Sequence, residues 1–135
     1  MKTRETPVVV MADDDDDDCM LARDAFEESG GEGAFLCVEN GLELMDFLSR
    51  SSSLPDLILL DLNMPRKDGR QALKEMKAIP AFQEIPVVVL TTSREEKDIA
   101  YSREMGANSF ITKPATFGEW VKIMKSLKDN WLADK

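Results

Sequence analysis

The chain has 135 residues, of which 43% are hydrophobic and 32% are charged, the composition of one soluble globular domain. No apolar run approaches the roughly 20 residues that a membrane helix needs. The N-terminus also lacks the long apolar region and the cleavage site of a secretory signal. We therefore expect a cytoplasmic protein without membrane association. The net charge of -9 argues against nucleic-acid binding, which requires a basic surface.

The histidine and cysteine content limits the kinds of catalytic and metal site that this chain can form. The chain contains no histidine, which excludes histidine-based zinc sites, Ser-His-Asp and Cys-His catalysis, and a phosphohistidine intermediate on this chain. It contains two cysteines, Cys19 and Cys37, and no CxxC pair. In a reducing compartment such cysteines are more often small buried apolar residues than partners in a disulfide, and we expect the same here.

Short apolar segments recur along the chain and predict strands at 7–11, 34–38, 56–60, 85–90 and 108–112. The third and fourth segments contain the runs LILL and VVVL, which are continuously apolar rather than alternating. This pattern is typical of strands that are covered on both faces, as in a parallel sheet.

Helical segments lie between the predicted strands. Three pairs have the spacing of a capping box at a helix start: Asn40 with Glu43, Ser93 with Glu96, and Thr116 with Glu119. A further helix begins near Asp68 and ends at Pro80. The last helix has an apolar stripe that includes Trp120 and continues to Trp131, and the sequence leaves open whether Trp131 joins the core or anchors a homodimer. Strand–helix alternation repeated five times predicts an open α/β fold with a parallel sheet.

The residues that follow the predicted strands carry the chemistry. Asp13 begins a run of six aspartates after the first strand, Asp61 follows the third, Thr91 follows the fourth and Lys113 follows the fifth. In a parallel sheet these positions meet at one edge, where open α/β folds bind their ligands. Carboxylates, a hydroxyl and an ammonium group are suited to a hard cation and a phosphoryl group.

Three segments carry a family resemblance: DLILLDLNMPRKDG, VVVLTTS and GANSFITKP, in this order. The chain resembles response-regulator receiver domains of two-component signalling over nearly its whole length. It is most similar to the small single-domain regulators of phytochrome-type sensor kinases, a finer likeness carried by DDDDDD and KDNWL. The resemblance implies a flavodoxin-like (βα)5 fold with strand order 2-1-3-4-5 and helices on both faces. It also implies one receiver domain over 1–135, with tails at 1–6 and 132–135.

The roles of the family carry over position by position. The resemblance makes Asp61 the phospho-acceptor and Asp13 a ligand of Mg²⁺, and it assigns the backbone carbonyl of Asn63 to the same metal. Thr91 matches the hydroxyl that turns toward the phosphoryl group, and Lys113 matches the lysine that pairs with a phosphoryl oxygen.

Two further features follow from the resemblance. Phe110 matches the aromatic side chain whose rotation reports the phosphorylated state, and the bond between Lys113 and Pro114 is expected to be cis, which X-Pro pairs tolerate at modest cost. Asp15 to Asp18, in contrast, are expected to be solvated or to cap the first helix, where the helix dipole favours acids.

Receivers carry two adjacent acids after the first strand, and here the chain departs from the pattern. In our preferred register of the alignment, the two acidic positions of the family fall on Ala12 and Asp13. An alternative register places them on Asp13 and Asp14 and extends the strand through Ala12. We prefer the first register because it turns three residues of the first helix toward the sheet, namely Met20, Leu21 and Ala25. We then expect Asp14 or a water to fill the gap, with Mg²⁺ bound more weakly than usual.

The resemblance implies a phosphorylation switch, not an enzyme beyond slow self-catalysed phosphotransfer and autodephosphorylation. Its donor is a sensor histidine kinase or a phosphotransfer protein, and its output is protein–protein contact, because no room remains for an output domain.

Two alternatives remain. A pseudo-receiver would keep the fold without the chemistry, as Ala12 suggests. A metal-dependent phosphatase would need a second acid two residues after its nucleophile, where this chain has Asn63.

Overall fold

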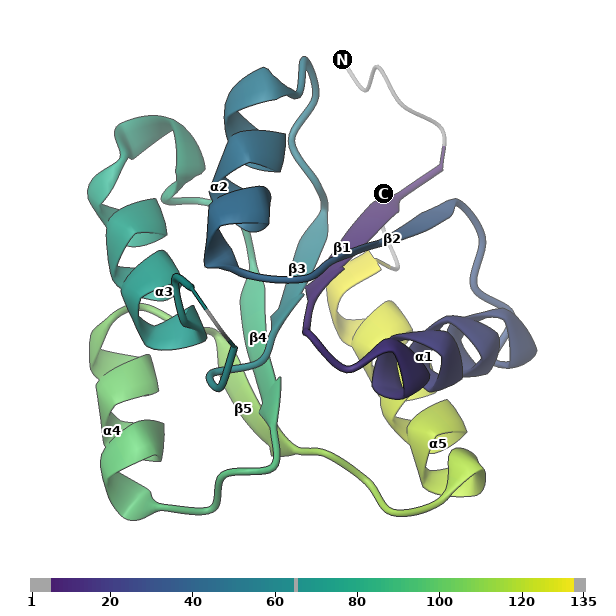
Figure 1. Ribbon diagram of the computed structural model, residues 1–135. Coiled ribbons are helices and arrows are strands. Elements are labelled where there is room, and N and C mark those ends of the chain that lie inside the picture. The colour runs from purple at the N-terminus through teal and green to yellow at the C-terminus, as the bar shows by residue number, and fades with distance from the viewer. Residues whose placement is uncertain (1–5, 65, 133–135) are drawn as a thin grey trace.

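A single parallel sheet organises the molecule (Figure 1). The computed structural model describes residues 6–64 and 66–132. The strands are β1 (Val8–Ala12), β2 (Ala34–Val38), β3 (Leu57–Leu60), β4 (Val87–Thr91) and β5 (Ser109–Thr112), in the order β2-β1-β3-β4-β5. The helices are α1 (Asp16–Glu28), α2 (Gly41–Arg50), α3 (Gly69–Ala78), α4 (Glu96–Glu104) and α5 (Phe117–Leu127). The predicted flavodoxin-like fold and strand order are confirmed, with strand ends within two residues of those expected.

The continuously apolar runs form strands that are covered on both faces of the sheet, as predicted. Every residue of β3 and β4 is buried, because these central strands are covered on both faces. Figure 1 shows α1 and α5 on one face of the sheet and α2, α3 and α4 on the other. Each face has its own apolar core: one contains Phe26, Trp120 and Met124, and the other contains Leu44, Leu73 and Met76.

Two of the three predicted helix caps form. The side chain of Asn40 accepts from the amide of Glu43, and that of Thr116 accepts from the amide of Glu119. The two Glu carboxylates accept from the amides of Glu39 and Ala115, one residue before each cap, rather than from the cap residue as in a full capping box. The third prediction is wrong, because α4 begins after Glu95 and has no side-chain cap. Ser93 lies outside the helix, and its hydroxyl is bonded to a buried carboxylate instead.

The C-terminal helix ends in a π-helical turn, η2 (Lys128–Leu132). Trp120 is buried within α5, and Trp131 of η2 packs against the same core while remaining partly exposed. Leu132, which the sequence analysis placed in a tail, is buried in this core. The rest of the expected tails, apart from the exposed Thr6, lies outside the described residues.

The cysteines differ from their expected state. Cys19, in the first turn of α1, and Cys37, near the end of β2, form a disulfide whose Cα atoms are 6.5 Å apart. The expectation of two separate thiols is therefore wrong. The crossover from β1 through α1 to β2 returns the chain beside its own starting point, and this brings together two residues 18 positions apart.

Reduction of this disulfide is expected to lower the free energy of unfolding by about 3 kcal/mol, because it frees a loop of this length in the unfolded chain. Urea titrations with and without a reductant measure the difference. A variant with Cys19→Ser and Cys37→Ser serves as the control and should not respond to the reductant. Equal midpoints for the wild type in both conditions would contradict the prediction.

None of the helices in the described part of the chain combines the length and the apolar character needed to cross a bilayer.

Candidate functional site

The predicted site residues meet at the carboxyl edge of the sheet. Asp13, Asp61 and Lys113 directly follow β1, β3 and β5, and Thr91 is the last residue of β4. All neighbouring strands are parallel, so their carboxyl ends lie at the same edge. The structure therefore brings together four residues separated by as many as 100 positions in the chain.

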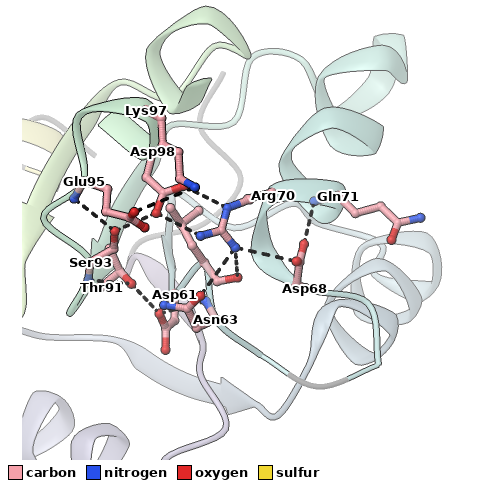
Figure 2. Close-up of polar contacts among 11 residues, drawn as sticks. Asp61, Asn63, Asp68, Arg70, Gln71, Thr91, Ser93, Glu95, Lys97 and Asp98 are labelled. Atoms are coloured by element: carbon pink, nitrogen blue, oxygen red, sulfur yellow. Dashed lines mark hydrogen bonds and ion pairs between the residues drawn. The ribbon is translucent and has the colours of Figure 1, made fainter. Parts of the chain in front are cut away.

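Asp61 is held in place by its surroundings. Its carboxylate is buried, with 6% of the residue exposed, and its backbone amide donates to the carbonyl oxygen of Ala12 at 3.0 Å. Its Oδ1 atom accepts a hydrogen bond of 2.7 Å from the Thr91 hydroxyl and one of 3.2 Å from the amide of Asn63 (Figure 2). The predicted switch hydroxyl is thus in direct contact with the predicted acceptor.

Lys113 is the cation of the site. Its Nζ atom lies 2.7 Å from Asp13 Oδ2, 2.7 Å from Asp18 Oδ2 and 3.3 Å from Asp61 Oδ2. Burial lowers the pKa of Lys113, but the contacts with Asp13 and Asp18 outweigh burial and raise the pKa above its ordinary value. The ammonium group therefore stays charged and compensates several carboxylates.

Asp13 has a perturbed carboxyl group. Burial raises its pKa to about 6, although the contact with Lys113 opposes this shift. Its Oδ1 accepts a hydrogen bond from the amide of Asp15 at 2.9 Å. Its buried Oδ2 lies beside Lys113 but accepts no hydrogen bond of good geometry from the residues described.

A group of three carboxylates can hold a cation. Oxygen atoms of Asp13, Asp14 and Asp61 all lie within 4.8 Å of one another. Hard divalent cations prefer such oxygen ligands, and a cation relieves the repulsion between close carboxylates. The buried Oδ2 of Asp13, which lacks a well-aligned donor, is an available ligand atom. These residues therefore fit a divalent cation.

The structure contradicts our preferred register for the acidic pair. Ala12 is the last residue of β1 and is fully buried, so the adjacent acids that follow the strand are Asp13 and Asp14. Of the three helix residues expected to face the sheet in the other register, Ala25 is buried, but Met20 and Leu21 are exposed, and α1 buries Cys19, Ala22 and Phe26 in their place. The expected deficit in Mg²⁺ binding has no basis once Ala12 is assigned to the strand.

The remaining aspartates divide between two roles. Asp15 caps α1, as expected for this run, by accepting from the amide of Asp18. Asp18 itself is a site residue that the sequence analysis missed, since its carboxylate pairs with Lys113. The sequence did not predict this role because Asp18 is one of six consecutive acids, and such a run does not indicate which side chain faces inward.

Two predictions from the family resemblance have different outcomes. The described chain contains no cis peptide bond, so the Lys113–Pro114 bond is trans and the expected cis isomer is wrong. The trans form is the intrinsically favoured isomer of an X-Pro bond, and Lys113 reaches its three carboxylates with it. Phe110 is partly buried and lines a cavity of about 340 Å³ between α4 and β5. Its role as a switch stays a prediction.

A polar network beside Asp61 was not predicted from the sequence. Figure 2 shows Arg70 of α3 between Asp98 of α4 and Asn63, close to Asp61. Asp98 is 3% exposed, and the ion pair with Arg70 holds its pKa below the ordinary value. Both residues lie on helices and resemble ordinary surface charges in the sequence, so no local signal marks them.

Comparison with known proteins identifies the family. The family model described as the response regulator receiver domain matches residues 9–125. The chain belongs to this family. Receiver domains are the regulated modules of two-component signalling, and the predicted family is thereby confirmed.

The similar proteins include phytochrome response regulators. Response regulator Rcp1 of Synechocystis sp. is 36% identical over 130 residues, which cover 93% of this chain and 88% of Rcp1. The crystal structure of the phosphorylated cyanobacterial phytochrome response regulator RcpA has a TM-score of 0.90 and 37% identity, with 97% of each chain covered. The Mn²⁺-bound form of Rcp1 has a TM-score of 0.84 and 36% identity, with 93% of this receiver and 94% of Rcp1 covered. The expected relation to phytochrome regulators is confirmed.

Proposed function

We propose that this receiver is a phosphorylation switch in which Asp61 accepts a phosphoryl group from a phosphohistidine of a sensor kinase or a phosphotransfer protein. The observation that carries the proposal is the contact of one buried carboxylate with both a hydroxyl and an ammonium group, from Thr91 and Lys113. A phosphorylated form of the similar protein RcpA supports it.

The chemistry follows from these contacts. A carboxylate oxygen of Asp61 attacks phosphorus, an O–P bond forms, and the P–N bond to the donor imidazole breaks, which leaves the electron pair on the imidazole nitrogen. Negative charge is spread over the phosphoryl oxygens during transfer. Lys113 stabilises that charge, and the Thr91 hydroxyl, which donates to Asp61 before transfer, becomes a donor to the phosphoryl group.

We assign a Mg²⁺ site to Asp13, Asp14 and Asp61, with the backbone carbonyl of Asn63 as a further ligand. When bound, the ion neutralises charge on the carboxylates and on the phosphoryl oxygens. The existence of an Mn²⁺-bound form of the similar protein Rcp1 supports the binding of a divalent cation. Autodephosphorylation is expected to be slow, because Asn63 stands where aspartyl phosphatases carry their acid/base residue.

Phosphorylation adds up to about two negative charges to the edge of the sheet. We propose that these charges bias an existing equilibrium at the face formed by α4, β5 and α5, where Phe110 lies. The output would be contact with another protein.

The test is intact-mass analysis after incubation with acetyl phosphate and Mg²⁺. The wild type is expected to gain one phosphoryl group, and neither Asp61→Asn nor a sample in EDTA should gain it. Asp24→Asn, which removes an exposed carboxylate from α1, is the matched control and should be labelled like the wild type.

The outcomes separate the alternatives. No adduct on the wild type, under conditions that label another receiver, would favour the pseudo-receiver and contradict the proposal. Steady release of phosphate from a phosphomonoester would favour the phosphatase. A label that persists in Asp61→Asn would mean that the acceptor is a different residue.

A further inference from the structure

Arg70 and Asp98 form a fork-to-fork ion pair beside the acceptor (Figure 2). Arg70 Nε donates to Asp98 Oδ1 at 3.0 Å, and Nη2 donates to Oδ2 at 2.9 Å. The Asp98 carboxylate is buried, and the Arg70 side chain is 31% exposed. Two parallel bonds to a buried partner fix the plane of the guanidinium group.

The third nitrogen of that group faces Leu62 and Asn63, the two residues that follow the proposed acceptor and that we call the acceptor loop. Arg70 Nη1 lies 3.4 Å from the carbonyl oxygen of Leu62 and 3.4 Å from Asn63 Oδ1. These two residues directly follow Asp61, and the amide of Asn63 donates to the Asp61 carboxylate. The backbone of Arg70 is also held, because its carbonyl oxygen accepts from the Tyr101 hydroxyl of α4 at 3.2 Å.

The same network reaches the loop after β4. The Ser93 hydroxyl donates to Asp98 Oδ2 at 2.6 Å, and the amide of Ser93 lies 3.5 Å from the Thr91 hydroxyl oxygen. Asp98 therefore contacts both Arg70 and Ser93. Through Asp98, Arg70 joins the loops on the two sides of Asp61, one carrying Asn63 and the other following Thr91.

We propose that Arg70 is a positioning residue of the phospho-acceptor site, which holds the Leu62–Asn63 segment in the conformation that binds the divalent cation. In the described contacts, Arg70 does not touch the Asp61 carboxylate. It acts on the site through its contacts with Leu62 and Asn63. This inference rests on the proposed function, because it concerns the same cation site.

The role requires the shape of the guanidinium group and not only its charge. Arg70 uses one edge for Asp98. Its remaining nitrogen contacts Leu62 and Asn63 and also lies 3.6 Å from Asp68 Oδ2. A lysine ammonium is a compact charge on a flexible stem and cannot make both sets of contacts in a fixed plane. Arg70→Lys is therefore expected to keep a charge partner for Asp98 while it loses the hold on Leu62 and Asn63.

Removing Arg70 alone would leave Asp98 buried without its partner, which is destabilising by itself. The test therefore uses two variants, Arg70→Lys and the double variant Arg70→Gln with Asp98→Asn, which removes both charges. Arg50→Gln is the matched control, because it breaks another Arg–Asp ion pair, with Asp46, at an exposed position on α2.

Calorimetric titration of Mg²⁺ into each unphosphorylated protein measures the effect directly. Both Arg70 variants are expected to bind Mg²⁺ about tenfold more weakly than the wild type, as is typical when a group that orients metal ligands is lost. Arg50→Gln should bind like the wild type. The amide of Asn63 should exchange its hydrogen faster in both Arg70 variants than in the wild type when measured in EDTA. If Arg70 acted only through its charge, Arg70→Lys would exchange this hydrogen at the wild-type rate.

Mg²⁺ affinity within twofold of the wild type in both Arg70 variants would overturn the inference. So would weaker binding in the double variant with full affinity in Arg70→Lys, because charge alone would then suffice. Labelling of the wild type by acetyl phosphate tests the proposed function separately. If the wild type binds Mg²⁺ but is not labelled, the proposed function fails while the affinities still decide the role of Arg70.

Discussion

Replacing Lys113 by methionine is expected to lower the free energy of unfolding of the metal-free protein by about 3 kcal/mol or more, because it leaves buried carboxylates without their cation. Lys113 is 7% exposed in its side chain and lies within 3.3 Å of three carboxylates, those of Asp13, Asp18 and Asp61. Urea titration in EDTA at pH 8 measures the loss. Lys122→Met, at an exposed position on α5, is the control.

The loss should depend on pH in a defined direction. Burial raises the pKa of Asp13 to about 6, and Lys113 restrains this rise, so the variant should have an even higher value. A carboxyl group with a raised pKa in the folded state favours folding when it is protonated, and this contribution is lost as the pH rises through the folded pKa. The deficit of Lys113→Met is therefore expected to be smaller at pH 5 than at pH 8.

The same variant should also lose phosphoryl transfer, because the ammonium group that would stabilise the phosphoryl oxygens is absent. Labelling of Lys113→Met by acetyl phosphate is expected to be slower by roughly a hundredfold. A stability equal to that of the wild type at pH 8, or labelling at the wild-type rate, would contradict the role given to Lys113.

Gly69→Ala is expected to lower the free energy of unfolding by about 2 to 3 kcal/mol, because the added methyl group overlaps backbone that cannot move independently. A Cβ atom at Gly69, the first residue of α3, would overlap the carbonyl oxygen of Asp61 and lie 2.7 Å from the Cα atom of Leu62. Helix α3 must then shift away from the acceptor loop, and labelling of Asp61 should slow as well.

Gly118→Ala is the matched control. Gly118 also lies in the first turn of a helix, α5, but a Cβ atom there would meet nothing within 4 Å. Alanine is intrinsically favoured over glycine in helices, so this variant should be as stable as the wild type or slightly more stable. Similar thermal midpoints for Gly69→Ala and Gly118→Ala would show that α3 does not pack tightly against the acceptor loop.

The sequence by itself determined the strands, the fold and most of the site. A strand buried on both faces admits no unpaired charge, so the first charged residue after each apolar run marks the edge of the sheet. This reasoning located Asp61 and Lys113 correctly, and the family resemblance supplied the strand order and the roles of these residues. The helix caps at Asn40 and Thr116 were predictable because each joins residues three positions apart.

The register after β1 was decided only by the tertiary structure. Ala12 is apolar enough to end a strand and small enough to begin a loop, so composition alone leaves both registers open. The choice depended on which residues of α1 face the sheet, and successive helical residues differ by about 100° in direction. The packing of α1 beside α5 sets that rotation and buries Ala22 and Phe26 instead of Met20 and Leu21.

The remaining features connect positions far apart in the chain. Asp18 and Lys113 are separated by 95 positions, Arg70 and Asp98 by 28, and the disulfide partners by 18. Whether two such side chains meet depends on how each helix crosses the sheet, and periodicity along the chain does not encode that crossing. Each of these residues also has an ordinary alternative as a solvated charge or a small core residue. For this reason the sequence located Asp61 and Lys113 at the edge of the sheet, while only the tertiary structure revealed the contacts that hold them in place.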